Sequence, residues 1–348
     1  MATIKGEIHM AVVLSGIGGF LPPRVVTNDD LSATLDTNDE WIRTRTGISE
    51  RRVVSDGLST GTLAVEAGAR ALRSAGVSGV DTVVVATTSP DRLCPAVAPE
   101  VASRLGMGPV AAFDLTSACS GFLYGLAASA GLIASGTAES VLFIGSEAFT
   151  TLVNQRDRGT APIFGDGAGA VVLRRGEDDE PGALGPFDLG SDGSLADLLA
   201  IPAGGSRQRS ADASLGHDSV PTEDWYLRME GRPLYTQAVE RMTQSAQAVL
   251  KRTAWSVADV DWFVGHQANV RIVRAVAEEL EVPMERVAVN IDRVGNTLSA
   301  SVPLLLNDIA ASGDLKPGDR VLLSAFGAGL SWGSTALVWP DIRAEHVN

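Results

Sequence analysis

The segment AVEAGARALRSAGVSGVDTVVVATT (Ala64 to Thr88) recurs in altered form as AVERMTQSAQAVLKRTAWSVADVDWFVGHQA (Ala238 to Ala268). In both copies an amphipathic helical pattern leads through a short linker containing Val-Asp to an apolar run typical of a buried strand. The two copies begin roughly 175 residues apart, and such internal repeats must be recognised before a fold is assigned. The pattern indicates a duplicated chain.

Two further pairs of segments support the duplication. GLIASGTAESVLFIGSEA (Gly131 to Ala148) resembles LNDIAASGDLKPGDRVLLSAFGA (Leu306 to Ala328), each a helix end followed by Gly and a buried strand. GAGAVVL (Gly167 to Leu173) resembles GSTALVW (Gly333 to Trp339). Helices that alternate with β-branched apolar strands predict a mixed α/β fold, and two copies predict two sheets that share a central helical layer.

The length and composition suit an ordinary globular enzyme with two such halves, which we assign to residues 1–180 and 181–348. The formal net charge of -14 argues against nucleic acid as a partner, because phosphate binding needs a basic surface. No apolar run approaches membrane-spanning length, and no metal-ligand cluster is present, so neither membrane nor metal is expected. The two cysteines, Cys94 and Cys119, provide no disulfide framework, which predicts a reducing, cytoplasmic location.

Cys119 is the first candidate for chemistry. It lies where a strand ending near Leu115 gives way to a small-residue helix that begins at about the cysteine. A thiol at a helix N-terminus is expected to have a lowered pKa, which favours the thiolate that attacks thioesters. The alternative is a small buried apolar residue, the usual role of a free cysteine, and this is the interpretation that the surroundings of Cys94 favour.

His266 is the second candidate, because it directly follows the apolar strand DWFVG (Asp261 to Gly265). A lone histidine at a strand end is more often structural, but the repeat makes His266 equivalent to Thr87 and Thr88, near the layer that contains Cys119. The other histidines, which we expect to be solvated and inert, are His9, His217 and His346.

Asn296 is the third candidate, at a loop-to-helix start that the duplication makes the counterpart of the Cys119 segment. It could simply cap the helix. Its amide could instead donate a hydrogen bond to a substrate carbonyl, which enolate chemistry requires.

Two glycine-rich segments match known motifs only superficially, and one further stretch is predicted to be a loop. GIGGFLPP (Gly16 to Pro23) is not a dinucleotide motif, because prolines stand where the helix should begin. GLSWG (Gly329 to Gly333) matches a hydrolase elbow by chance, since a strand pattern follows Ser331. The stretch Gly204 to Asp224 is predicted to be a long surface loop, either a tolerated insertion or a binding element.

Six motifs follow one another along the chain: DTNDEWIRTRTGISERR (Asp36 to Arg52), ACSGF (Ala118 to Phe122), DRGTAPIFGDGAGA (Asp157 to Ala170), GHQANVRI (Gly265 to Ile272), GNTLSASVP (Gly295 to Pro303) and FGAGLSWG (Phe326 to Gly333). With these motifs the chain resembles the β-ketoacyl-acyl-carrier-protein synthase III family, which starts fatty-acid and some polyketide chains. The resemblance implies a thiolase-like fold of duplicated mixed sheets in five αβαβα layers, and it implies a homodimer.

The resemblance also implies a mechanism, with Cys119, His266 and Asn296 as the catalytic triad. Cys119 would accept an acyl group from an acyl-CoA starter while the backbone N–H groups of Cys119 and Ala328 stabilise the oxyanion. His266 and Asn296 would then hydrogen-bond the carbonyl of a malonyl thioester on acyl carrier protein, so that decarboxylation gives an enolate that attacks the acyl-cysteine. CoA thioesters are substrates here, and no bound cofactor is expected.

Substrate contacts follow from the same resemblance. Trp41 would stack on the adenine of CoA, and Arg45 and Arg158 would face its phosphates, although both arginines could be ordinary surface charges. Asn269 would line the pantetheine tunnel or cap a helix, and Phe164 would form part of the wall near the cysteine or belong to the core.

Two departures from the family pattern concern specificity. Cys94 stands where many relatives place a phenylalanine at the end of the acyl pocket, which leaves room for longer or branched starters in a pocket that the partner subunit completes. The helix after His266 has Glu278 and Glu279 where relatives often have paired lysines. Only Arg271 and Arg274 remain there to attract an acidic carrier protein.

Three functions are compatible with these residues. Decarboxylative condensation is favoured because both His266 and Asn296 are present. Simple acyl transfer to an alcohol or amine would use His266 as a general base and would not need Asn296. A non-catalytic partner subunit is disfavoured, since it need not keep all three residues. A cysteine protease is disfavoured because the local signatures of that class are absent.

Overall fold

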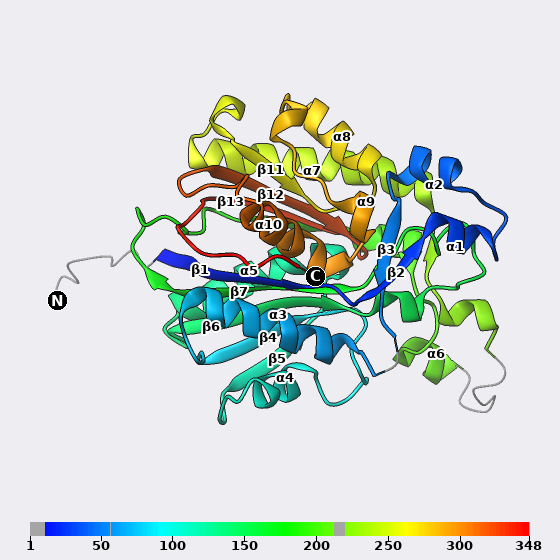
Figure 1. Cartoon of the computed structure of the whole chain (residues 1–348), viewed down its shortest axis with the longest axis horizontal. Helices are drawn as coiled ribbons and strands as arrows, with labels where there is room; N and C mark the ends of the chain where they lie inside the picture. The colour runs from blue at the N-terminus through cyan, green and yellow to red at the C-terminus, as the bar shows by residue number, and fades with distance from the viewer. Residues whose placement is uncertain (1–10, 56, 212–219, 348) are drawn as a thin grey trace.

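The elements stack in five alternating layers of helix and sheet (Figure 1). The computed structural model describes residues 11–55, 57–211 and 220–347. α3 (Thr60–Ala75) and α4 (Ala98–Arg104) cover one outer face, α5 (Gly121–Ala134) and α10 (Ser301–Ala311) lie between the sheets, and α7 (Gly231–Thr253) and α8 (Val270–Glu279) cover the other outer face. The predicted shared helical layer is confirmed.

The two sheets have the same strand order. The first sheet runs β1 (Ala11–Phe20), β7 (Gly167–Gly176), β6 (Ser140–Glu147), β4 (Thr82–Ala86) and β5 (Ala111–Leu115). The second runs β8 (Asp188–Ser191), β13 (Ser331–Val338), β12 (Arg320–Gly327) and β11 (Trp262–Gly265). In both sheets the first two pairings are antiparallel and the third is parallel. A parallel bridge between Phe263 and Val287 occupies the place of β5. The predicted duplication of mixed sheets is therefore confirmed.

The central helix α5 must fit between two sheets, which explains its small residues. A Cβ atom at Gly125 would lie 2.0 Å from the Phe143 ring, so any larger residue would clash with β6. Phe122, also on α5, stacks on Phe143 with ring centroids 5.4 Å apart. This close packing fixes the start of α5, where Cys119 lies.

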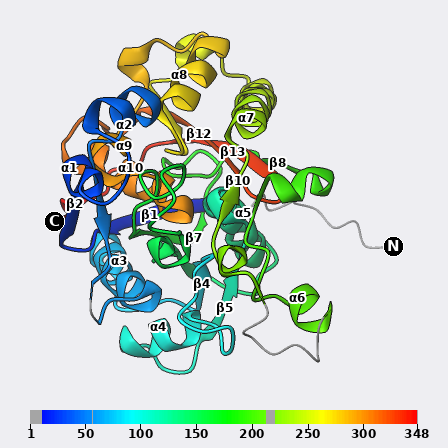
Figure 2. The ribbon, with the colours of Figure 1, turned by 90° about the vertical axis from the view of Figure 1, so that its right-hand side faces the viewer.

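The remaining elements lie around the strand ends. They are β2 (Arg24–Thr27), α1 (Asn28–Ser32), α2 (Asp39–Thr46), β3 (Glu50–Val53), β9 (Leu199–Ala200), α6 (Ser206–Ala211), β10 (Arg228–Met229) and α9 (Ile291–Val294). Figure 2 shows α2 beside α8 and α9 at one end of the molecule. The predicted boundary between residues 180 and 181 falls between β7 and β8.

Part of the predicted surface loop Gly204 to Asp224 is helical, as α6, and its residues 212–219 lie outside the described residues. His9 and His217 also lie outside them, and His346 is exposed. Within the described ranges, every helix is too short or too polar to traverse a lipid bilayer.

Candidate active site

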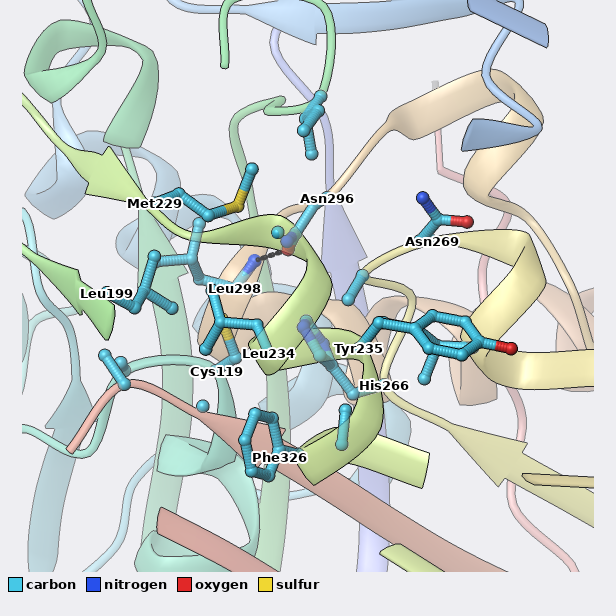
Figure 3. A pocket seen from close by; sticks show the side chains of 18 of the residues that line it. Cys119, Leu199, Met229, Leu234, Tyr235, His266, Asn269, Asn296, Leu298 and Phe326 are labelled. Carbon is cyan, nitrogen blue, oxygen red and sulfur yellow. Dashed lines mark hydrogen bonds between the residues drawn. The ribbon is translucent and has the colours of Figure 1, made fainter. Parts of the chain in front are cut away.

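A mainly apolar pocket of about 780 Å³ lies at the strand ends, between the two halves (Figure 3). Seven of the predicted site residues line it: Cys119, Phe164, His266, Asn269, Arg271, Asn296 and Ala328. They come from both halves of the chain. The duplication therefore brings two separately encoded sets of side chains to one cavity.

Cys119 lies on the short 3₁₀ helix η1 (Ala118–Ser120) that leads into α5, as predicted. Only 6% of its surface is exposed. Burial raises the pKa of the Cys119 thiol to about 12, the nearby Glu147 carboxyl raises it further, and a hydrogen bond with the Asn296 side chain opposes both. The expectation that the helix start lowers this pKa is thus wrong, because desolvation of a thiolate outweighs the local dipole.

His266 directly follows β11, where its backbone N–H donates to the Ser324 carbonyl at 2.9 Å. The ring is buried, and no described residue hydrogen-bonds Nδ1 or Nε2. Burial lowers the pKa of His266 to about 3, so the imidazole is neutral at physiological pH. A neutral ring has one N–H donor and one acceptor nitrogen, and here both are free for a ligand in the pocket.

Asn296 is buried, and backbone hydrogen bonds hold it in place. Its N–H donates to the Ile163 carbonyl at 2.9 Å, and its carbonyl accepts from Gly165 N–H at 3.0 Å. Oδ1 accepts from the Leu298 N–H at 2.9 Å, the dashed line in Figure 3. The amide oxygen thus has the local capping role, while the side chain also reaches Cys119, so capping and a role in the pocket are compatible.

Ala328 follows the last residue of β12, Gly327. A Cβ atom at Gly327 would lie 2.7 Å from the Cys119 backbone nitrogen, so glycine is needed for this close approach. The approach brings the backbone before Ala328 against the start of η1. Ser331 begins strand β13, as predicted, and its hydroxyl lies 2.7 Å from that of Ser120 and donates to the Ala328 carbonyl, which are structural contacts.

Trp41, Arg45 and Arg158 gather beside the pocket without lining it. The guanidinium carbons of Arg45 and Arg158 lie 4.4 and 4.8 Å from the centre of the Trp41 ring. Arg158 also pairs with the exposed Asp36 at 3.2 Å. One aromatic ring and two cations are therefore available together for a ligand that carries a base and phosphates.

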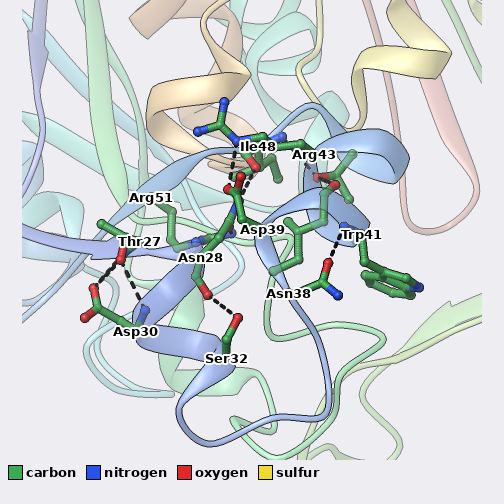
Figure 4. A network of polar contacts seen from close by, with 12 residues as sticks. Thr27, Asn28, Asp30, Ser32, Asn38, Asp39, Trp41, Arg43, Ile48 and Arg51 are labelled. Atoms are coloured by element: carbon green, nitrogen blue, oxygen red, sulfur yellow. Dashed lines mark hydrogen bonds and ion pairs between the residues drawn. The ribbon is translucent and has the colours of Figure 1, made fainter.

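A hydrogen-bond network fixes α2, the helix that carries Trp41 (Figure 4). Asp39 accepts from Arg43 and from the amide of Asn28, and Asn28 in turn accepts from Arg51. Arg51 is 1% exposed, also donates to the Pro162 carbonyl at 2.7 Å, and has its pKa lowered to about 10 by burial. The network thus ties α2 to the segment that carries Phe164.

Asn269 and Arg271 lie at the start of α8, on the wall of the pocket. Asn269 caps α8 by accepting from Arg271 N–H at 2.9 Å, and it donates to the Arg45 carbonyl. The Arg271 guanidinium lies 5.8 Å from the centre of the Tyr235 ring. Asn269 therefore links α8 to α2.

Phe164 is both core and wall, since it is 4% exposed, contacts the Phe149 ring at 5.1 Å and lines the pocket. Two predicted residues lie neither in the pocket wall nor in the group around Trp41. Cys94 is exposed in a turn, and Arg274 is exposed on α8. Within the described ranges, no group of three or more His, Cys, Asp or Glu side chains could hold a metal ion.

Three buried charged residues at this end of the molecule have no role predicted from the sequence: Arg51, Glu147 and Asp166. Glu147 ends the apolar run VLFIGSE and is completely buried. A charged residue at the end of such a run is the signal that could have identified it. Arg51 and Asp166 lie inside quoted motifs, and no local signal distinguishes them from the other charged residues there.

Comparison with protein-family models gives two matches. Residues 113–193 match the model described as 3-oxoacyl-[acyl-carrier-protein (ACP)] synthase III, and residues 250–339 match its C-terminal model. The first match contains Cys119, and the second contains His266 and Asn296. Both halves of the site thus fall within matched regions.

Individual relatives match over almost the whole chain. A protein of Streptomyces coelicolor named beta-ketoacyl-[acyl-carrier-protein] synthase III 5 is 57% identical over 334 residues, which are 96% of this chain and 99% of the relative. The crystal structure of 3-oxoacyl-(acyl carrier protein) synthase III from Pseudomonas aeruginosa PAO1 has a TM-score of 0.89 at 47% identity, covering 96% of this chain and 99% of that one. The priming beta-ketosynthase of the R1128 polyketide pathway has a TM-score of 0.87 at 34% identity, covering 96% and 97%.

Proposed function

The chain belongs to the β-ketoacyl-[acyl-carrier-protein] synthase III family, and from this we propose that it initiates fatty-acid or polyketide synthesis by decarboxylative Claisen condensation. The observation that carries the proposal is the pocket in which the Cys119 thiol, the unpartnered neutral imidazole of His266 and the Asn296 amide meet. A nucleophile and two hydrogen-bond donors are what the two half-reactions need.

In the first half-reaction, Cys119 Sγ attacks the carbonyl carbon of an acyl-CoA. The backbone N–H groups of Cys119 and Ala328 stabilise the tetrahedral oxyanion, and the C–S bond to CoA breaks. The proton lost by the thiol leaves with CoA as its free thiol. Because burial disfavours a free thiolate, we expect thiol deprotonation to accompany attack rather than precede it.

In the second half-reaction, a malonyl thioester enters the same pocket. His266 and Asn296 donate hydrogen bonds to its thioester carbonyl oxygen, so that the electron pair released with CO2 is held as an enolate. The enolate carbon attacks the carbonyl carbon of the acyl-cysteine, the C–S bond to Cys119 breaks, and a β-ketoacyl thioester is formed. The released thiolate takes a proton from water, which restores the thiol. The lowered pKa of His266 supports this role, since the ring keeps a single N–H at neutral pH without a competing charge.

We assign the binding of the two thioester carriers, CoA and acyl carrier protein, to the mouth of the pocket. We propose that CoA places its adenine on Trp41 and its phosphates near Arg45 and Arg158, with Asn269 and Phe164 along the tunnel. Malonyl-acyl carrier protein is proposed to dock on the α8 face that carries Arg271 and Arg274. The reaction needs no bound cofactor, because protein groups supply every donor and the nucleophile.

We further propose that the enzyme is a cytoplasmic homodimer. β5 is the edge strand of the first sheet, and its Phe113 is 38% exposed. In the turn 91–96, Leu93 is 77% exposed and Cys94 is exposed. An uncovered apolar edge strand of this kind requires a partner. A second copy would cover the edge and bring Cys94 towards the partner's acyl pocket.

Intact-mass spectrometry tests the proposal. The protein is mixed with a panel of acyl-CoAs, with C119S as control, and then chased with malonyl-CoA or malonyl-carrier protein. We expect one acyl mass on the wild type, none on the control, and discharge as a β-ketoacyl product. A label that malonyl thioesters never remove would indicate transfer to another acceptor, and no label at all would refute the role of Cys119.

Substitution of Asn296 by Ala separates condensation from simple acyl transfer. Loss of one oxyanion-type donor is expected to slow condensation by roughly 10²–10³-fold. Acylation of Cys119 should continue, because that step uses backbone donors. The two rates are measured separately by the acylation time course and by release of CO2 from malonyl thioester. Equal losses in both rates would contradict the assigned role.

A further inference from the structure

Glu147 is a buried carboxyl group directly beneath the active site. It is the last residue of β6, is 0% exposed, and lies close enough to Cys119 to raise the pKa of that thiol. Its hydrogen-bond partners in the described ranges are hydroxyl and peptide N–H groups, and none is a cation. Oε2 contacts Ser89 Oγ at 2.6 Å, Thr88 N at 3.1 Å, Ser89 N at 3.2 Å and Thr87 Oγ1 at 3.3 Å. Oε1 contacts Ser299 Oγ at 2.9 Å and Thr88 N at 3.1 Å.

The contacts of Ser299 locate a proton. Its Oγ lies 2.9 Å from Glu147 Oε1 and 3.0 Å from the Ala86 carbonyl oxygen. A serine hydroxyl carries one hydrogen and cannot donate a full hydrogen bond to each of two acceptors. Both contacts are hydrogen bonds if Glu147 carries the proton on Oε1, donates it to Ser299 Oγ, and leaves the serine hydrogen for Ala86. The other carboxyl oxygen then accepts from its four donors.

Ser299 belongs to the turn that presents Asn296. It lies on the 3₁₀ helix η8 (Leu298–Ala300), whose first N–H donates to Asn296 Oδ1. A Cβ atom at Gly121 would lie 3.2 Å from Ser299 Cβ, so η8 packs directly on the start of α5 next to Cys119. A shift of Ser299 would therefore move Asn296 relative to the nucleophile.

We propose that Glu147 is a positioning residue for the condensation half-reaction: as a neutral acid it donates from Oε1 to Ser299 and thereby holds the Asn296 amide against Cys119. The inference rests on the proposed function. Ionisation of Glu147 would remove the donor, leave Ser299 with two competing acceptors, and place an unpaired charge under the reacting atoms.

The surroundings of Glu147 favour the neutral acid. The groups that face it are the hydroxyls and N–H groups of the segment after β4, Ser299 on η8 and the Cys119 thiol on η1. Thr60 on α3 reaches it through Ser89, and β7 offers Gly167. Burial raises the pKa of Glu147 to about 7, and the hydrogen bonds that Ser89, Thr88 and Thr87 donate oppose that shift.

The test follows single-turnover reaction of pre-formed acyl-Cys119 with a malonyl thioester, from about pH 5.5 to about pH 9. Acylation removes the Cys119 thiol from titration, and His266 is neutral throughout this range. We expect the wild-type condensation rate to fall by about ten-fold per pH unit above neutral. The rate of E147Q should match the wild-type rate within about two-fold at the acid end and should not change as the pH rises. The control, Glu139→Gln just before β6 at its other end, should behave as wild type.

An alkaline limb that persists in E147Q would overturn the proposal, as would equal losses by E147Q in acylation and condensation at every pH. Ser299→Ala provides a second test, because it removes the hydroxyl through which Glu147 acts. It should slow condensation by roughly 10-fold while acylation proceeds normally. Failure of wild-type condensation altogether would instead refute the proposed function, so the two failures are distinguishable.

Discussion

Two strands that end at the site, one from each half of the chain, end in opposite ways. In the N-terminal half, β6 ends at Glu147, whose oxygens have six hydrogen-bond contacts. In the C-terminal half, β11 leads to His266, whose ring nitrogens have no described partner. A buried polar atom without a partner costs about 1–3 kcal/mol, and because His266 lines the pocket, a ligand there can supply the missing partner. The N-terminal half thus contributes a fully hydrogen-bonded carboxyl group, Glu147, that supports the site. The C-terminal half contributes a ring, His266, whose nitrogens are available to a ligand.

The largest effect should come from His266, whose ring nitrogens have no described partner. Substitution of His266 by Ala removes a donor to the thioester carbonyl and should slow decarboxylation by roughly 10²–10³-fold. Acylation of Cys119 should keep its amplitude, because its oxyanion donors are backbone groups. Rapid-quench acylation and CO2 release measure the two steps. A loss confined to acylation would reverse the assigned division of roles.

Glu147 and His266 should also affect the free energy of unfolding, with opposite pH dependence. Burial raises the pKa of Glu147 from 4.5 to about 7, so its contribution is fully present below about pH 4.5 and is lost as the pH rises through about 7. Burial lowers the pKa of His266 from 6.5 to about 3, so its contribution is present above about pH 6.5 and is lost as the pH falls towards about 3.

Urea unfolding of wild type, E147Q and His266→Ala over this pH range tests the opposition. E147Q should remove part of the loss of stability on the alkaline side, and His266→Ala should remove part of the loss on the acid side. Curves that shift in parallel for both variants would show that neither group titrates as described.

The smallest effect concerns the hydroxyl of Thr88, whose backbone N–H supports Glu147. Thr88 Oγ1 is buried, lines the pocket and forms no hydrogen bond in the described residues, although its N–H donates to Glu147. Thr88→Val keeps the shape and the N–H, so we expect a change in unfolding free energy within about 1 kcal/mol and an unchanged condensation rate. Thr88→Ser is the matched control. A large rate loss in the valine variant alone would assign the hydroxyl to substrate.

Local sequence predicted the reactive side chains because their placement is local. Cys119 and Asn296 stand at helix starts and His266 at a strand end, and the repeat related the three positions. The pKa of Cys119 was misjudged because the helix start is visible in sequence, whereas burial depends on β12 and η8, which are distant in the chain. Glu147 and Ser299 are 152 residues apart, so no local pattern relates them.

Trp41, Arg45 and Arg158 were grouped through family resemblance, and their proximity depends on tertiary structure. Arg158 pairs with Asp36, which precedes α2, across 122 residues of chain. Arg51 could not be distinguished from the surface arginines of its motif, because its burial follows from the packing of β3 against α9.

The strand order has a consequence for the synthesis of the protein. β1 pairs with β7, with Ala11 opposite Gly176. The edge strand β1 is therefore synthesised long before the strand with which it pairs. At roughly 5–20 residues per second on the ribosome, this delay is on the order of ten to thirty seconds. Both strands belong to the first sheet, which can therefore close before the second is made. Its inner face then remains without α10, an exposed apolar surface that a nascent-chain chaperone would be expected to shield.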